Sequence, residues 1–338
     1  MIELEIKDTL KELKAQGADY ADIRFHSTDL NEHIHIRDVL MKNYQMESKS
    51  GYGVRVLCKG AWGFFSSEDP KLLKATAKVA LEKAIAASHF IQEKVTLAPK
   101  KVYKDTYCSN IGTDPFDVNL EEKIELLRNI NSKLEHKSFD FVGAYASFNK
   151  RQVLFFDTEG SEIEKNILEV DPSFYAYAKD KDGLNQSRSY IMYQNAMNSS
   201  TVGYEKLLDK KQFLDHPSRI KEELLSVLSA PIQKEETCSL IPLPEMMALQ
   251  THETIGHALE LDRILGYELS YAGGSHVDLE HFNKLEFGSK KLNARASGTT
   301  PNSPGTEGYD DDGVKGVDVQ MIKDGILQNA ITSRQMII

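Results

Sequence analysis

The chain has 338 residues, of which 41 are Lys or Arg and 51 are Asp or Glu, so its formal net charge is −10. Hydrophobic residues make up 41%. These values are typical of a globular protein and exclude wholesale disorder or a collagen-like repeat. The acidic balance argues against direct nucleic-acid binding, because phosphate contacts need clustered Lys and Arg.

Neither a membrane segment nor a secretory signal is recognisable in the sequence. No apolar run approaches the roughly 18 residues that a membrane helix needs, and the amphipathic N-terminus lacks an apolar signal core. Cys58, Cys108 and Cys238 are widely spaced and form no CxxC pair. We therefore expect a cytoplasmic protein without disulfides and without a membrane partner.

The first hundred residues are expected to form helices packed on antiparallel strands. Apolar residues at helical spacing predict a helix that starts near Ile2 and stops at Gly17. Asp69 and Pro70 mark the start of a second helix, which Ala, Leu and Lys residues extend to about Glu93. Alternating apolar and polar residues predict strands at 20–27, 32–41 and 51–66, with a hairpin turn at Lys59-Gly60.

The middle of the chain repeats this combination of helix and sheet. Periodicity is lost over 95–115, and Asn119 and Glu122 then form a capping pattern for a helix to about Glu135. A further helical segment over 204–228 is interrupted near Pro217. Between the two helices we expect an antiparallel meander with turns at Asn149-Lys150, Glu159-Gly160 and 181–183.

The last part opens with a short strand at 238–244 that two prolines punctuate. We expect an α+β protein in which helix-plus-antiparallel-sheet units precede a β-rich catalytic domain carrying a metal-binding helix. The expected domains are residues 1–100, 101–230 and 231–338.

The helix expected after Pro244 contains His252, Glu253 and His257, which together read His-Glu-x-x-x-His. This pattern is one residue longer than the His-Glu-x-x-His zinc motif. At about 100° per residue, histidines five apart point roughly 140° away from each other on a regular α-helix. A wider, π-type turn would bring them nearly into line, and such turns concentrate at functional sites.

The helix has one face suited to chemistry and another suited to a core. His252 and His257 can bind Zn²⁺ through neutral imidazoles, and Glu253 is placed to act as general base on a metal-bound water. The alternative is a helix whose histidines are solvated or capped. Glu260 and Gly256 share the polar face, whereas the opposite face carries Met247, Thr251, Ile255 and Ala258.

Other groups in the sequence have a weaker case for function. His33 and His35 would share one strand face, where solvation is the simpler interpretation. The run 310–312 is acidic but lacks calcium-loop spacing, and we expect a solvated loop there. Trp62 is expected in the core. His276, Glu280 and His281 are expected on a surface loop, although they could reach the metal.

Four segments resemble the TldD/PmbA family of metallopeptidases, also described as modulators of DNA gyrase. They are GADYADIRF at 17–25, GYGVRVLCKGAWGFFSS at 51–67, HETIGHALELD at 252–262 and GTEGYDDDG at 305–313. The resemblance implies a TldD-type protein in which His252 and His257 bind zinc and Glu253 is the catalytic carboxylate. It also implies a homodimer, or a heterodimer with a PmbA-type homologue, that hydrolyses short or unfolded peptides.

The sequence departs from the family pattern at the third metal ligand. The resemblance implies a cysteine near the C-terminus, but no Cys follows Cys238, and the chain ends in ITSRQMII. We therefore expect a truncated catalytic domain. Two hypotheses follow. One is a zinc-dependent peptidase that takes extended peptides at a strand edge. The alternative is a non-catalytic peptide-binding subunit or a fragment of such a peptidase.

Overall fold

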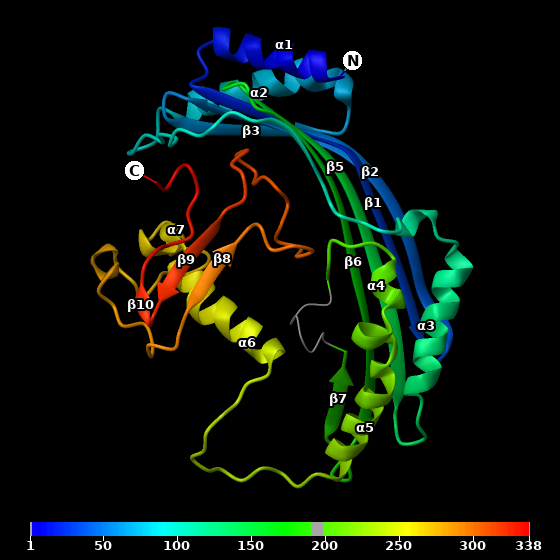
Figure 1. The fold of residues 1–338 in the computed structure, drawn as a ribbon. Helices are drawn as coiled ribbons and strands as arrows, with labels where there is room; N and C mark the ends of the chain where they lie inside the picture. Colours follow the sequence, from blue (N-terminus) through cyan, green and yellow to red (C-terminus); the bar gives the residue numbers. More distant parts are fainter. Residues whose placement is uncertain (1, 191–198, 338) are drawn as a thin grey trace.

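The computed structural model describes residues 2–190 and 199–337, and it contains two bodies (Figure 1). The first is a large curved sheet with its helices, and the second is a smaller unit that holds the end of the chain. The helices are α1 Ile2–Ala15, α2 Leu73–Ala87, α3 Leu120–Leu134, α4 Glu205–Leu208, α5 His216–Ser229, α6 Pro244–Thr251 and α7 Leu261–Ile264. The strands are β1 Tyr20–Arg37, β2 Leu40–Cys58, β3 Ala61–Ser67, β4 Lys104–Cys108, β5 Phe141–Asp157, β6 Glu162–Lys179, β7 Asn185–Ser189, β8 Ala294–Ser297, β9 Asp318–Lys323 and β10 Ile326–Leu327.

The α+β class is confirmed. The large sheet has the order β3-β2-β1-β5-β6-β4, with β7 also paired to β6. Its pairs are antiparallel except for β4, which runs parallel to β6. Strands from before and after residue 100 thus share one sheet, and the expected domain boundaries stay predictions. Within the described residues, no helix has both the length and the apolar character needed to cross a bilayer.

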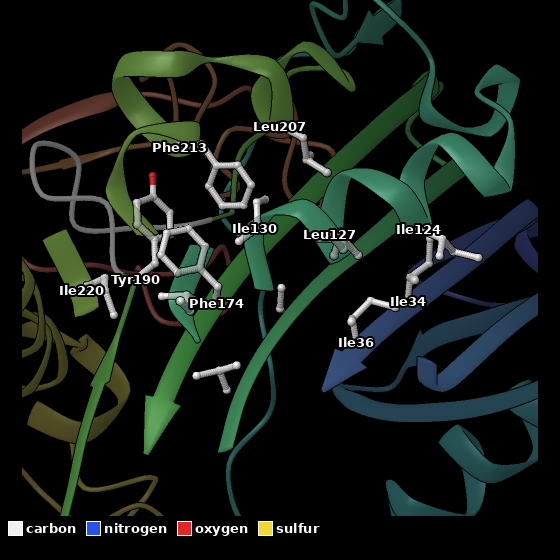
Figure 2. Packing of buried hydrophobic residues seen from close by; sticks show 14 of the residues in the cluster. Ile34, Ile36, Ile124, Leu127, Ile130, Phe174, Tyr190, Leu207, Phe213 and Ile220 are labelled. Atoms are coloured by element: carbon white, nitrogen blue, oxygen red, sulfur yellow. The ribbon is translucent and has the colours of Figure 1, made fainter. Parts of the chain in front are cut away.

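Helices cover one face of the large sheet. Even-numbered β5 residues from Val142 to Phe148 lie in a core with α3 and α5, part of which Figure 2 shows. Phe156, also even-numbered, lies in a second core with α1 and α2. Because side chains alternate along a strand, both cores are on the same face. A bulge in β1 between His26 and Thr28 restores the same face for Ile34 and Ile36.

The opposite face of the sheet is polar and looks toward the smaller unit (Figure 1). That unit contains the three-stranded sheet β10-β9-β8 and α6 and α7. Its core is small. The buried residues are Leu259, Val277, Met321, Ile322 and Leu327.

Several local predictions are confirmed. The hairpin turn at Lys59-Gly60 has both residues at positive φ, which matches the twist of the flanking strands. Asp69 caps the turn that leads into α2, and Asn119 caps α3 by accepting from the Glu121 N–H. Pro217 lies in the first turn of α5, so the break expected there marks a helix start.

Four local predictions were wrong. The strands at 20–27 and 32–41 form one strand, β1, which ends before a turn at Asp38-Val39. Asn149-Lys150 is not a turn but the middle of β5. The second helix ends at Ala87, and 238–244 includes no strand. The tertiary contacts explain the two errors in the sheet: Asn131 accepts from the Val39 N–H, and Asn149 donates to Asn31 on the next strand.

Candidate metal centre

The two histidines of the motif face each other across a π-type turn. α6 continues into π-helical residues His252–Gly256 and then a 3-10 turn at His257–Leu259. The His257 N–H donates to the carbonyl of His252, five residues earlier. The ring centroids lie 4.3 Å apart with planes at 74°. The predicted π-type turn, which aligns histidines at this spacing, is therefore confirmed.

Three potential ligands converge at this turn. Donor atoms of His252, Glu253 and His257 all lie within 4.8 Å of one another. The side chains of His252 and Glu253 are 61% and 57% exposed, whereas that of His257 is 30% exposed. Imidazole nitrogen and carboxylate oxygen are donors that Zn²⁺ accepts, so the residues present fit this ion. Their exposure leaves room for a substrate.

Glu260 and Arg263 hold the ring of His257. Glu260 Oε1 lies 2.9 Å from His257 Nδ1, and Arg263 Nη2 lies 3.0 Å from the same nitrogen. Arg263 also bonds the Glu260 carboxylate and donates to the Ala272 carbonyl at 2.7 Å. A guanidinium nitrogen only donates and a carboxylate oxygen only accepts, so Nδ1 accepts from Arg263 in one tautomer of His257, whereas Nδ1–H donates to Glu260 in the other. The tautomer that donates to Glu260 leaves the lone pair of Nε2 available to a metal.

The segment after the motif is anchored to the small core. Leu259 and Ala258 are buried. Ile331 N–H donates to the Leu259 carbonyl at 2.7 Å, and Ser275 Oγ donates to the Ala258 carbonyl at 2.6 Å. The position of His257 is therefore fixed by its C-terminal neighbours, because α6 before it has no buried residue.

The expected core face of the helix is only partly present. Ile255 packs against the small core and Ala258 is buried, but Met247 and Thr251 are exposed. A Cβ built on Gly256 would meet only the Thr251 carbonyl oxygen, at an ordinary 3.7 Å. The glycine is thus not required by close packing.

No cysteine joins the cluster within the part of the chain that the structure describes. Cys58 is buried in the core with α1 and α2. Cys108 and Cys238 are exposed, the latter in the extended segment 231–243. The described residues therefore supply two imidazoles and a carboxylate, with no thiolate beside them.

The acidic loop is docked on the sheet. Asp311 pairs with Arg24 at 2.7 Å, and Asp312 pairs with Arg55 at 2.8 Å. Although burial opposes it, Arg24 lowers the pKa of Asp311, whereas burial raises that of Asp310. These ion pairs occupy the carboxylates that a cation would need. The side chain of Asp311 is 70% exposed, as expected for a solvated loop, whereas that of Asp312 is 19% exposed, so the expectation was wrong for Asp312.

The remaining sequence candidates also have structural partners. His33 and His35 share a face, as expected, and bond Ser147 and Tyr175. His281 Nδ1 accepts from the Asp278 N–H in a capping box. The ring of His276 lies near that of Phe287 at a tilt of 47°, and half-buried Trp62 donates to Gln335. Asp278, Glu280 and His281 form the second cluster with metal-compatible spacing among the described residues.

The sequence prediction did not include the basic residues that hold the smaller unit on the sheet. Besides Arg24 and Arg55, Arg151 and Lys165 pair with Glu307 at 3.0 and 2.8 Å. All four lie on the polar sheet face. Alternation along β5 and β6 could have identified that face, but the acidic partner lies far along the chain.

The comparisons with known proteins agree with the fold and the motif. Residues 21–88 match PmbA/TldA metallopeptidase domain 1, and 235–336 match the PmbA/TldA metallopeptidase C-terminal domain. The chain therefore belongs to the PmbA/TldD family of metallopeptidases.

Two relatives show the extent of the sequence similarity. A metalloprotease of Methanocaldococcus jannaschii is 27% identical, over 99% of this chain and 70% of the relative. A protein of Saccharolobus solfataricus named zinc metalloprotease TldD homolog is 26% identical, over 96% of this chain and 67% of the relative. Both alignments therefore cover nearly all of this chain.

Solved structures support the same fold. A protein from Bacteroides thetaiotaomicron, named as a candidate modulator of DNA gyrase, has a TM-score of 0.74 at 16% identity. The alignment covers 98% of this chain and 72% of that one. TldE from Thermococcus kodakarensis has a TM-score of 0.61 at 12% identity, over 98% of this chain and 70% of its own.

Proposed function

We propose that the protein is a cytoplasmic zinc-dependent peptidase that hydrolyses short or unfolded peptides. The observation that carries the proposal is the convergence of His252, Glu253 and His257 across the π-type turn. His252 and His257 would hold the ion, and Glu260 would keep His257 in the ligating tautomer. Zinc bound there supplies Lewis acidity toward water and a peptide carbonyl oxygen.

Glu253 has the role of general base in this proposal. Its carboxylate lies beside the two imidazoles and is largely exposed, so it can accept a proton from an attacking water. The same group can return that proton to the leaving amine. An extended peptide would add to an exposed strand edge, where backbone hydrogen bonds select unfolded chains.

The test is Glu253→Gln in the purified chain. Peptide cleavage should be abolished, while zinc remains bound because the histidines are retained. Glu286→Gln, an exposed carboxylate in the same unit, is the matched control and should cleave normally. Unchanged turnover in Glu253→Gln would contradict the assignment of the base.

A second candidate function is a non-catalytic subunit that binds peptides. The absence of a thiolate from the cluster of described residues favours it, because catalytic zinc usually has three protein ligands. Such a subunit would form a heterodimer with a PmbA-type homologue, which the likeness to TldE supports. The alternative assembly is a homodimer. Zinc-dependent cleavage by the purified chain alone would exclude this candidate.

A further inference from the structure

A polar cavity lies on the helix-free face of the large sheet, away from the histidine motif. Its volume is about 590 Å³, in the range of sites that hold small ligands or peptide side chains. Four neighbouring strands form its floor, while Ser199 and Pro304 contribute to its walls. The cavity thus lies between the sheet and a loop of the smaller unit.

Strand register arranges the floor in two rows. Glu47, Asn31, Asn149 and Glu169 lie opposite one another across β2, β1, β5 and β6. Gln45, His33, Ser147 and Asp171 form the next row on the same four strands. Both rows are rich in hydrogen-bond acceptors. A ligand that fits them must therefore bring donors.

One carboxylate in the cavity lacks a counterion. Glu47 pairs with Lys49 at 2.7 Å, and Glu169 pairs with Arg151 at 3.1 Å. Asp171 is half-buried and makes no hydrogen bond or ion pair with any part of the chain that the structure describes. A buried carboxylate is stabilised by a positive charge. The cavity therefore has an unpaired negative charge on its floor.

One aromatic residue lies near this carboxylate. Tyr145 precedes Ser147 by two residues on the same face of β5, and its ring centroid lies 5.9 Å from that of His33. Asp171 is close enough to raise the pKa of Tyr145, after the larger effect of burial. A carboxylate together with a nearby aromatic ring is a combination that can bind an organic cation.

We propose that this cavity binds an ammonium or guanidinium group, as carried by a Lys or Arg side chain of an extended peptide. The inference rests on the proposed function and narrows its substrates to peptides with a basic residue. A bare metal ion fits less well, because the clusters with metal-compatible spacing among the described residues lie elsewhere. Asp171, which lines the cavity, would pair with the cation.

The experiment measures binding in the absence of cleavage. The full-length Glu253→Gln chain, kept zinc-free with EDTA, is titrated into fluorescent octapeptides that are identical except for two Lys or two Gln. The Lys peptide should bind about tenfold more tightly, as expected for hydrogen bonds to a charged group. Equal affinities would overturn the proposal.

Two variants of Asp171 locate the effect. Asp171→Asn should remove most of the preference for Lys, whereas Asp8→Asn on α1 should keep it. Asp171→Lys should favour a matching Glu peptide, a reversal that loss of folding cannot produce. A Lys preference that survives both changes would contradict the assignment. Competition by spermidine at the same concentration of amine groups would assign the site to free polyamines instead of peptides.

This readout separates the two proposals because it needs neither zinc nor turnover. A Lys preference without any cleavage by the wild-type chain would support the cation site and contradict the peptidase. Cleavage by the wild-type chain without any preference for the Lys peptide would support the peptidase and contradict the cation site.

Discussion

The two bodies of the molecule differ in the size of their apolar cores and in the interactions that hold them in place. Residues 2–229 have two large apolar cores under one face of a sheet, whereas 244–337 have a small core around Leu259 and Ile322. The smaller unit gains its place on the sheet from ion pairs and from Tyr309, which is buried near Phe155 and Ile163. The comparison shows a scaffold with large apolar cores that carries the candidate metal centre on a smaller unit, attached through ion pairs and one apolar cluster.

The largest effect is expected in the core of the scaffold. Phe174 is fully buried between Tyr190 and Phe213, so Phe174→Ala should reduce the free energy of unfolding by about 3–5 kcal/mol. Denaturant unfolding measures this, with the exposed Phe90→Ala as control. A loss no larger than that of Phe90→Ala would show that the scaffold does not depend on this core.

The buried ion pair of the scaffold should come next. Glu32 and Lys123 are 4% and 3% exposed and lie 2.5 Å apart. Glu32→Gln leaves the ammonium without its counterion, which should cost about 3 kcal/mol of unfolding free energy. Glu121→Gln, which removes the exposed partner of Arg128, should cost less than about 1 kcal/mol. Equal losses of unfolding free energy in the two variants would contradict the larger role of the buried ion pair.

A smaller effect is expected from weakening the attachment between the bodies. Tyr309→Ala removes a buried ring and its hydrogen bond to Asp105, so the smaller unit should separate more often from the sheet. Limited proteolysis within the smaller unit should accelerate roughly severalfold, without a comparable loss in scaffold stability. Tyr271→Ala, at 93% exposure, is the control and should leave the cleavage rate unchanged.

The weakest effect should come from pH. Burial opposes ionisation of Glu307, but Lys165 and Arg151 outweigh it and lower its pKa from 4.5. A carboxyl group with a lowered pKa stabilises the folded state above its ordinary pKa, and this contribution disappears as pH falls through the lower value. Proteolysis within the smaller unit should therefore accelerate below about pH 4.5.

Asp310 works in the opposite direction because burial raises its pKa. Comparing the pH dependence of proteolysis in the wild-type chain and in Glu307→Gln isolates the contribution of Glu307. An identical pH profile in that variant would contradict the role of the ion pair.

Local signals predicted much of the fold. The turn at Lys59-Gly60 and the caps at Asp69 and Asn119 depend on residues next to them, and each is present. Asn149 was misassigned because its turn propensity is outweighed by side-chain bonds to neighbouring strands. Val39 has a positive φ that its residue type disfavours, so the turn there had only the weak local signal of Asp38.

The candidate site followed the same rule. The spacing of His252 and His257 indicated that a π-type turn would align the rings, because five residues then complete one turn, and that turn is present. The attachment of the loop around Glu307 could not be predicted, since its partners Arg151 and Lys165 lie over 140 residues away. Charge patterns identify a polar face but not the segment that covers it.

The most direct test of the account is the zinc content of the purified chain. If His252 and His257 form a metal site, we expect close to one zinc ion per chain by elemental analysis, and His252→Ala should lose it. His276→Ala, which removes a histidine outside the motif, should retain it. Absence of zinc from the wild-type chain, or equal zinc in His252→Ala, would contradict the central claim.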